Sequence, residues 1–211
     1  MDDFLIYSSY LILLINLLLY SFSFFREGKA NVFFVSYLAF STLLQFSMEL
    51  VYHLGMSNLF LVNIFFIGQM IILWLFYNSS FEIKAQKTFV KSSLIIALLI
   101  LSVQFIMDSS QFLKFNLFGI TLTSLLIVVF ALLHFYNMLT ENKKYYYITA
   151  SIVFYLLAST VLFLIGNLST GLSADLRYLS WQLNAFLLII YYLIILFEWK
   201  VSFSKKESLQ S

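Results

Sequence analysis

Residues 30–53 read ANVFFVSYLAFSTLLQFSMELVYH, and this segment carries the clearest structural pattern in the chain. It is long and apolar enough to cross a lipid bilayer as a helix, which takes about 20 residues. One set of its polar side chains recurs at every fourth position. Four residues turn a helix by about 400°, so these side chains drift by only about 40° per step and form a single ribbon. The ribbon comprises Tyr37, Ser41, Gln45, Glu49 and His53.

Glu49 is the only acidic residue that we place well inside an apolar segment. A carboxyl group held in hydrocarbon is costly, so we expect it to face the protein interior or a wet cavity. The other helices should therefore pack around the ribbon.

The composition indicates a membrane protein. Of the 211 residues, 62% are hydrophobic and only 10% are charged, and the mean hydropathy is +0.95. A soluble domain carries roughly a quarter charged residues. The net charge of +2 does not indicate a nucleic-acid partner, because the basic residues lie in short loops. The chain has no cysteine, which excludes disulfides and thiolate metal sites.

Seven apolar segments of suitable length follow one another along the chain. The sequence therefore predicts an all-α membrane protein with seven transmembrane helices. We expect residues 1–199 to form this domain and residues 200–211 to form a short cytoplasmic tail. The segments are Phe4–Phe24, Ala30–His53, Leu59–Tyr77, Phe89–Met107, Phe115–Met138, Tyr145–Asn167 and Tyr178–Glu198.

The basic residues predict the orientation of the chain in the membrane. With seven spans, ten of the twelve fall on one side, and short loops rich in Lys and Arg stay in the cytoplasm. We therefore expect an outside N-terminus and a cytoplasmic C-terminus, in a multi-pass protein of the bacterial plasma (inner) membrane. Lys114 and Arg177 lie on the other side, and the ten are Arg26, Lys29, Lys84, Lys87, Lys91, Lys143, Lys144, Lys200, Lys205 and Lys206.

Residues 54–58, LGMSN, predict a tight hairpin between the second and third helices. Gly55 can adopt the left-handed conformation that ends a helix, and Ser57 or Asn58 can cap the next one. The two helices should then be antiparallel neighbours.

A weak internal similarity has two interpretations. Residues 37–44, YLAFSTLL, are similar to residues 155–162, YLLASTVL, and residues 63–66, NIFF, are similar to residues 184–187, NAFL. As a signal, this predicts a 3+1+3 layout of parallel repeats about an axis along the membrane normal. As coincidence, it is what two spans rich in Phe, Leu and Ile produce.

Polar side chains concentrate towards the predicted outer half of the spans, which suggests a cavity that opens outwards. We predict that Glu49, Asn63, Gln69 and Asn184 line it and bind a ligand or a proton. The alternative is that the amides are only hydrogen-bonding contacts between helices. The remaining candidates are Gln45, His53 and Gln182.

Metal, cofactor and enzyme readings receive little support from the sequence. Glu49 and His53, four residues apart, can share a metal, but a catalytic zinc site needs three protein ligands. No second buried carboxylate, serine–histidine pairing motif or phosphate-binding loop is evident. We predict no metal, no cofactor and no enzymatic activity.

One family resemblance is found in the third and seventh segments. Residues 57–69, SNLFLVNIFFIGQ, and residues 181–184, WQLN, resemble small bacterial seven-helix membrane proteins. Similar regions form the membrane-sensor part of some histidine kinases. That family often has an acidic residue at the position of Gln69, so a role of that acid does not carry over to this chain. The resemblance implies a sensor-like role.

These observations lead to three functional hypotheses. The first is a sensor or receptor that signals through a separate cytoplasmic partner. The second is a carrier of small solutes, protons or cations built from two three-helix repeats, with Glu49 as its proton or cation site. The absence of proline and the presence of only six glycines count against the carrier, since carriers often interrupt their helices. The third is an assembly or scaffold subunit of another membrane protein.

Overall fold

The computed structural model describes residues 2–139, 144–168 and 174–203, and they fold into α-helices joined by short loops. All seven predicted spans are present as long helices, and each is apolar enough to cross a membrane. A short 3-10 helix, η1 (Ser109–Leu113), lies in one connection. The helices are α1 (Asp2–Phe25), α2 (Val32–His53), α3 (Leu59–Ser80), α4 (Lys84–Met107), α5 (Leu117–Asn137), α6 (Tyr146–Leu168) and α7 (Ala174–Phe203).

Helices α4 and α7 exceed their predicted lengths the most, and α1 and α3 are also slightly longer than predicted. Helix α4 begins at Lys84, five residues before the predicted start, and its Lys84, Lys87 and Lys91 side chains are all exposed. These lysines are spaced by three and four residues, so they share one face of α4. The first turns of this helix are therefore polar and precede its apolar part. Helix α7 continues past Trp199 to Phe203, into the predicted tail. The rest of that tail, with Lys205 and Lys206, lies outside the described residues, as does Lys143.

The hairpin between α2 and α3 confirms the predicted role of Gly55. Its φ is +72°, and its N–H donates to the carbonyl of Tyr52. The N–H of Met56 donates to the carbonyl of Val51, which completes a Schellman motif. Asn58 occupies the N-cap position, but its side chain makes no cap and donates instead to the Met48 carbonyl.

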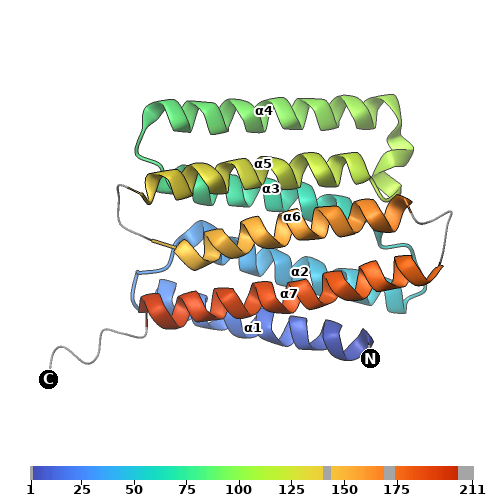
Figure 1. Ribbon diagram of the computed structural model, residues 1–211, viewed down its shortest axis with the longest axis horizontal. Helices are drawn as coiled ribbons and strands as arrows, with labels where there is room; N and C mark the ends of the chain where they lie inside the picture. Colours follow the sequence, from blue (N-terminus) through green and yellow to red (C-terminus); the bar gives the residue numbers. More distant parts are fainter. Residues whose placement is uncertain (1, 140–143, 169–173, 204–211) are drawn as a thin grey trace, which may run out of the picture.

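The helices form two layers of three, with α4 at one edge (Figure 1). One layer contains α1, α2 and α3, and the other contains α7, α6 and α5. Helix α1 packs on α7 and α3 packs on α5, so the two layers close into a six-helix ring. Helix α4 packs outside this ring, against α3 and α5.

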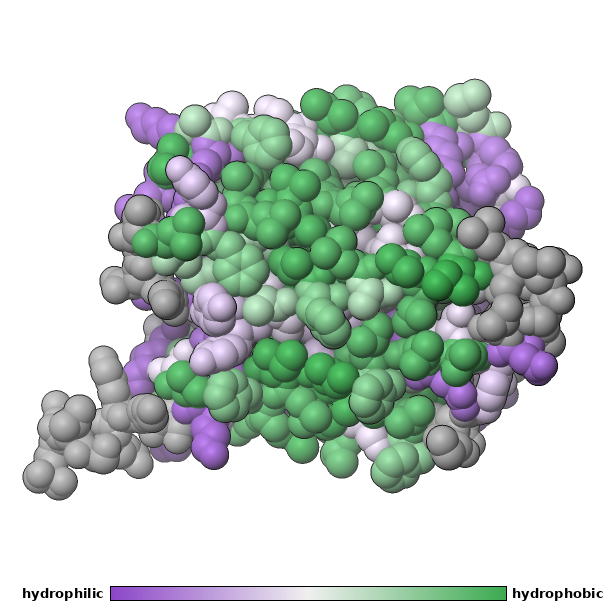
Figure 2. Space-filling view, viewed as in Figure 1, coloured by the Kyte–Doolittle hydropathy of each residue, from purple (hydrophilic) through white to green (hydrophobic). Residues whose placement is uncertain are grey.

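Apolar side chains cover the sides of the molecule between two hydrophilic ends (Figure 2). This belt matches the hydrocarbon layer of a bilayer, since each helix is about 30 Å long or more. We call the two ends of the bundle the Glu49 end, which includes η1, and the Glu198 end, where α7 finishes.

The contact between α1 and α7 is unusually polar. Five buried residues of α1 are spaced alternately by four and three, which keeps them on one face: Ser9, Leu13, Asn16, Tyr20 and Ser23. This face donates hydrogen bonds to backbone carbonyls of α7: the Asn16 amide to Tyr192 at 2.9 Å and the Tyr20 hydroxyl to Ile195 at 3.1 Å.

Helices α2 and α3 approach closely at Gly68. A Cβ atom added there would lie 2.2 Å from Cζ of Phe40. Reciprocal amide pairs fasten α4 to the ring from outside: Gln104 with Asn116, and Gln86 with Asn137. The centre of the ring is filled by side chains, and these form the candidate site.

Candidate functional site

The predicted ribbon on α2 faces the interior of the bundle over most of its length. Tyr37, Ser41 and Gln45 are 1%, 0% and 6% exposed. The side chains of Glu49 and His53 are 24% and 61% exposed, so burial falls steadily towards the Glu49 end. The four-residue period therefore identified a real interior face, although its last two members reach the surface.

At its deep end the ribbon joins a network of tyrosines. The Tyr191 hydroxyl of α7 donates to the Tyr37 hydroxyl at 3.0 Å. The side-chain amide of Gln69 on α3 donates to the same oxygen at 3.3 Å. Tyr155 of α6 stacks on Tyr191, with ring centroids 4.8 Å apart and planes at 22°. Three helices thus meet around one phenol oxygen, and α6 joins them through the stacked rings.

About two turns further along α2, Gln45 makes the next connection. Its side-chain amide donates to the Tyr192 hydroxyl at 2.6 Å. The Tyr191 and Tyr192 rings lie 5.2 Å apart, and Asn184 hydrogen-bonds Tyr155, so these groups form one unit. We call this unit the central cluster, and it consists of Asn16, Tyr37, Gln45, Gln69, Tyr155, Asn184, Tyr191 and Tyr192.

The central cluster contains several buried amide oxygens that accept no hydrogen bond. In the described part of the chain, four amide oxygens lack a hydrogen-bond partner: Asn16 Oδ1, Gln45 Oε1, Gln69 Oε1 and Asn184 Oδ1. Leaving a buried polar atom unpaired costs about 1–3 kcal/mol. The cluster is therefore chemically suited to accept hydrogen bonds from a small molecule.

Glu49 lies in a separate cluster at the end of the bundle. Its Oε1 atom is 3.0 Å from His53 Nε2 and 3.4 Å from the Tyr7 hydroxyl. The Tyr10 hydroxyl donates to Oε2 at 3.2 Å. We call Tyr7, Tyr10, Glu49 and His53 the Glu49 cluster, and it joins α1 to α2.

The structure separates Asn63 from the other candidates that were expected to share a cavity with it. Asn63 is 4% exposed, and its amide nitrogen lies 2.8, 2.9 and 3.3 Å from the backbone carbonyl oxygens of Phe112, Lys114 and Gln111. It holds the η1 segment against α3. The grouping of Glu49, Asn63, Gln69 and Asn184 around one space was wrong, because similar depth does not fix the direction in which a helix points a side chain.

Gln182 and Asn184 lie on α7 and are half-buried. Asn184 belongs to the central cluster through Tyr155. Gln182, two residues earlier, points in another direction along the helix, since two residues turn a helix by about 200°. It is engaged in an interaction of its own.

Sequence reasoning missed a second acid. Glu198 is 2% exposed, although the prediction placed it at the very end of the seventh span and treated Glu49 as the only interior acid. Its Oε2 atom accepts from the backbone N–H of Tyr147 at 2.8 Å, and Oε1 accepts from the Ser202 hydroxyl. A usable signal was present, because Tyr191, Ile195 and Glu198 share one helix face and the first two are buried.

The two histidines do not come together. His134 is 5% exposed near the Glu198 end, and its Nδ1 lies 3.0 Å from the Thr149 hydroxyl. Within the described residues, no three His, Cys, Asp or Glu side chains gather as a metal site.

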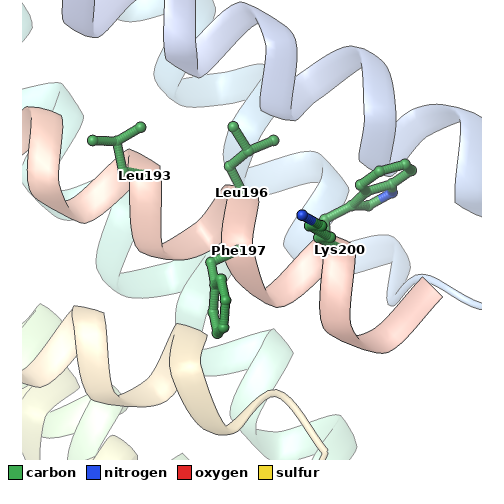
Figure 3. Close-up of a pocket in the computed structure, with 5 residues that line it drawn as sticks. Leu193, Leu196, Phe197 and Lys200 are labelled. Atoms are coloured by element: carbon green, nitrogen blue, oxygen red, sulfur yellow. The ribbon is translucent and has the colours of Figure 1, made fainter. Parts of the chain in front are cut away.

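One cavity lies on the outer surface of the bundle and not around the Glu49 cluster. It has a volume of about 440 Å³ and runs along α7 near the Glu198 end (Figure 3). Its lining is mostly apolar, with one cationic side chain at the end nearest the C-terminus. The lining residues are Leu193, Leu196, Phe197, Trp199 and Lys200.

Comparison of the chain with family models, with curated proteins and with solved structures finds no match.

Proposed function

We propose that this chain is a multi-pass plasma-membrane carrier that moves a small polar solute through the centre of its helical ring. The observation that carries the proposal is the central cluster, with its four unpartnered acceptors. Gln69 lies ten residues into α3, or about 15 Å along it, so the cluster is near mid-depth. In carriers built from repeats, the binding site lies near the bilayer midplane at the interface between the repeats.

The packing of the helices supports the two repeats that the carrier requires. A two-fold axis along the membrane normal would relate α1 to α5, α2 to α6 and α3 to α7. It would also relate the α1–α7 contact to the α5–α3 contact, and both contacts are present, with α4 left outside. Tyr37 and Tyr155, which the sequence comparison paired, both reach Tyr191.

The proposed orientation places the Glu49 end outside the cell. Helices of alternating direction bring the described basic loop residues, apart from Lys114 and Arg177, to the Glu198 end. Since the chain has no cysteine, Ser57→Cys and Glu82→Cys report the two ends separately. Both positions are exposed, and we expect an impermeant thiol reagent to label only Ser57→Cys in intact cells.

Within this proposal, Glu49 is the proton or cation site at the outer mouth. Its partners Tyr7, Tyr10 and His53 are side chains that can rotate away, so the carboxylate can exchange with the outside solution. The polar groups continue inwards from Tyr10 and Gln45 to Tyr192 and Tyr191.

The test is solute flux in liposomes that contain the purified chain. Swelling under an inward gradient is followed by light scattering for xylitol, lactate and tetramethylammonium, one neutral, one anionic and one cationic probe. We expect at least one probe to enter about tenfold faster than into protein-free liposomes. If none enters while a thermal melt shows folded protein, the carrier proposal is wrong.

A sensor is the second candidate, and one observation favours it. Glu49 and His53 are partly exposed, so a ligand outside the cell could reach them without any opening of the ring. Such a protein would signal through a separate cytoplasmic partner. Silent liposomes, together with a cytoplasmic protein that co-purifies and is released by Glu49→Gln, would support the sensor over the carrier.

A further inference from the structure

We propose that the central cluster recognises a small, uncharged polyhydroxylated solute, a class of substrate that rests on the carrier function proposed above. The first argument is the set of four unpartnered amide oxygens. Asn16, Gln45, Gln69 and Asn184 each present an amide oxygen with no donor in the described part of the chain. A ligand that satisfies them must bring several N–H or O–H groups.

The second argument concerns charge. No acidic or basic side chain belongs to the cluster, and its titratable members are tyrosines. The nearest acid in the ribbon, Glu49, is already engaged by Tyr7, Tyr10 and His53 at the end of the bundle. A charged solute would lose its hydration shell in the cluster without gaining a counter-charge, which is strongly unfavourable in a membrane interior.

The third argument concerns shape. Tyr155 and Tyr191 stack almost in parallel, and Tyr192 lies beside them at 47° to Tyr191. Aromatic faces provide apolar contact area beside the amide oxygens. A polyol presents the matching pair of surfaces, C–H groups on one side and hydroxyl groups on its edges. Hydroxyl groups can also exchange hydrogen bonds with the phenols, which both donate and accept.

The test measures binding separately from transport. The purified chain is titrated with xylitol at millimolar concentrations, and its thermal midpoint is recorded. Lactate and tetramethylammonium serve as charged probes. We expect a saturable rise of the midpoint with xylitol and none with the charged probes.

Variants locate the binding. Gln45→Met and Gln69→Met remove an acceptor at nearly constant volume, and each should weaken xylitol binding about tenfold. Gln104→Met is the matched control, because Gln104 pairs both amide atoms with Asn116 outside the ring. Gln104→Met should leave xylitol binding unchanged. A rise of the thermal midpoint that is equal in all variants would be a non-specific effect of xylitol on the solvent.

The outcomes separate this inference from the carrier proposal. Xylitol binding that depends on Gln45 and Gln69 without any flux would keep the ligand class and reject the carrier. Flux of a charged probe with no xylitol binding would keep the carrier and reject the ligand class. If no probe binds and Gln69→Met raises the thermal midpoint, the unpartnered oxygens face only internal water, and the ligand class is wrong.

Discussion

Glu49 and Glu198 lie at opposite ends of the bundle, and the two acids are used in opposite ways. At the Glu198 end, the carboxylate is 2% exposed and accepts from the backbone N–H of Tyr147 at the start of α6. At the Glu49 end, the Glu49 side chain is 24% exposed and its partners are two phenols and an imidazole. Glu198 thus accepts a hydrogen bond from the backbone of another helix, whereas the partners of Glu49 are all side chains.

This difference indicates which end opens at the lower cost. A carboxylate near the first amides of a helix satisfies donors that have no partner within the helix and interacts favourably with the helix dipole. Glu198 therefore fixes α6 to α7. Side-chain partners rotate without breaking a helix, so the Glu49 end can rearrange while the Glu198 end stays closed. In a carrier or a sensor, the Glu49 end is then the moving part.

The largest expected effect comes from Glu198→Ala. The substitution leaves the partly buried Tyr147 N–H without its acceptor and creates a void between α6 and α7. We expect a loss of about 2–3 kcal/mol in the free energy of unfolding, read as a clear fall in the thermal midpoint in detergent.

Two control variants belong to that measurement. Glu82→Ala removes an exposed acid at the same end and should change the free energy of unfolding by about 0.5 kcal/mol or less. Glu198→Gln keeps an acceptor for Tyr147 and should recover part of the loss. Equal thermal midpoints for Glu198→Ala and Glu82→Ala would show that Glu198 does not fix α6 to α7, and the proposed difference between the two ends would be wrong.

Glu49→Ala should have a smaller effect on stability. Partly exposed contacts between a carboxylate and a basic side chain contribute about 0–1 kcal/mol to the free energy of unfolding, and the contact of Glu49 with His53 is of this kind. Glu49→Gln should leave the thermal midpoint unchanged, yet solute flux should lose its dependence on outside pH because a glutamine side chain cannot exchange a proton. Flux in liposomes at several outside pH values measures this. A stability loss as large as that of Glu198→Ala would mean that Glu49 is a structural residue.

Much of this architecture could be predicted from the sequence, because apolar length and helical period are local properties. The interior face of α2 from Tyr37 to Gln45 and the stop at Gly55 were predicted for that reason and confirmed, whereas Glu49 and His53 reach the surface. Glu198 was missed because the apolar segment ends there, whereas the helix continues for five more residues and the Glu198 carboxylate contacts the start of α6.

The composition of the site depended on contacts that no local pattern contains. Asn63 and Gln69 both lie on α3, yet one binds the η1 carbonyls and the other binds Tyr37. Their difference of six residues turns the helix by about 600°, that is, to another face. Tyr191 and Tyr192 were not among the predicted site residues, although both are buried in the structure.

The smallest expected effect concerns Asp108, which begins η1 at the Glu49 end. Its Oδ1 accepts from the Ser110 hydroxyl and N–H, and its Oδ2 accepts from the Gln111 amide at 2.9 Å. Hydrogen bonds from Ser110 and Gln111 lower the pKa of Asp108 below its ordinary value of 3.8. The ionised carboxylate therefore stabilises the η1 segment fully above pH 3.8, and this stabilisation is lost as pH falls through the lower pKa of the folded state. The loss should be slight, since the carboxylate is exposed and Asn63 still holds the η1 carbonyls.

Amide hydrogen exchange in residues 109–113, compared at equal pH with Asp108→Asn, measures this loss, because asparagine keeps an acceptor for Ser110 but does not titrate. We expect the wild-type segment to lose protection relative to the variant only at acid pH. If both chains respond to acid alike, Asp108 does not control this segment, and the mobility of the Glu49 end rests on Glu49 and its side-chain partners alone.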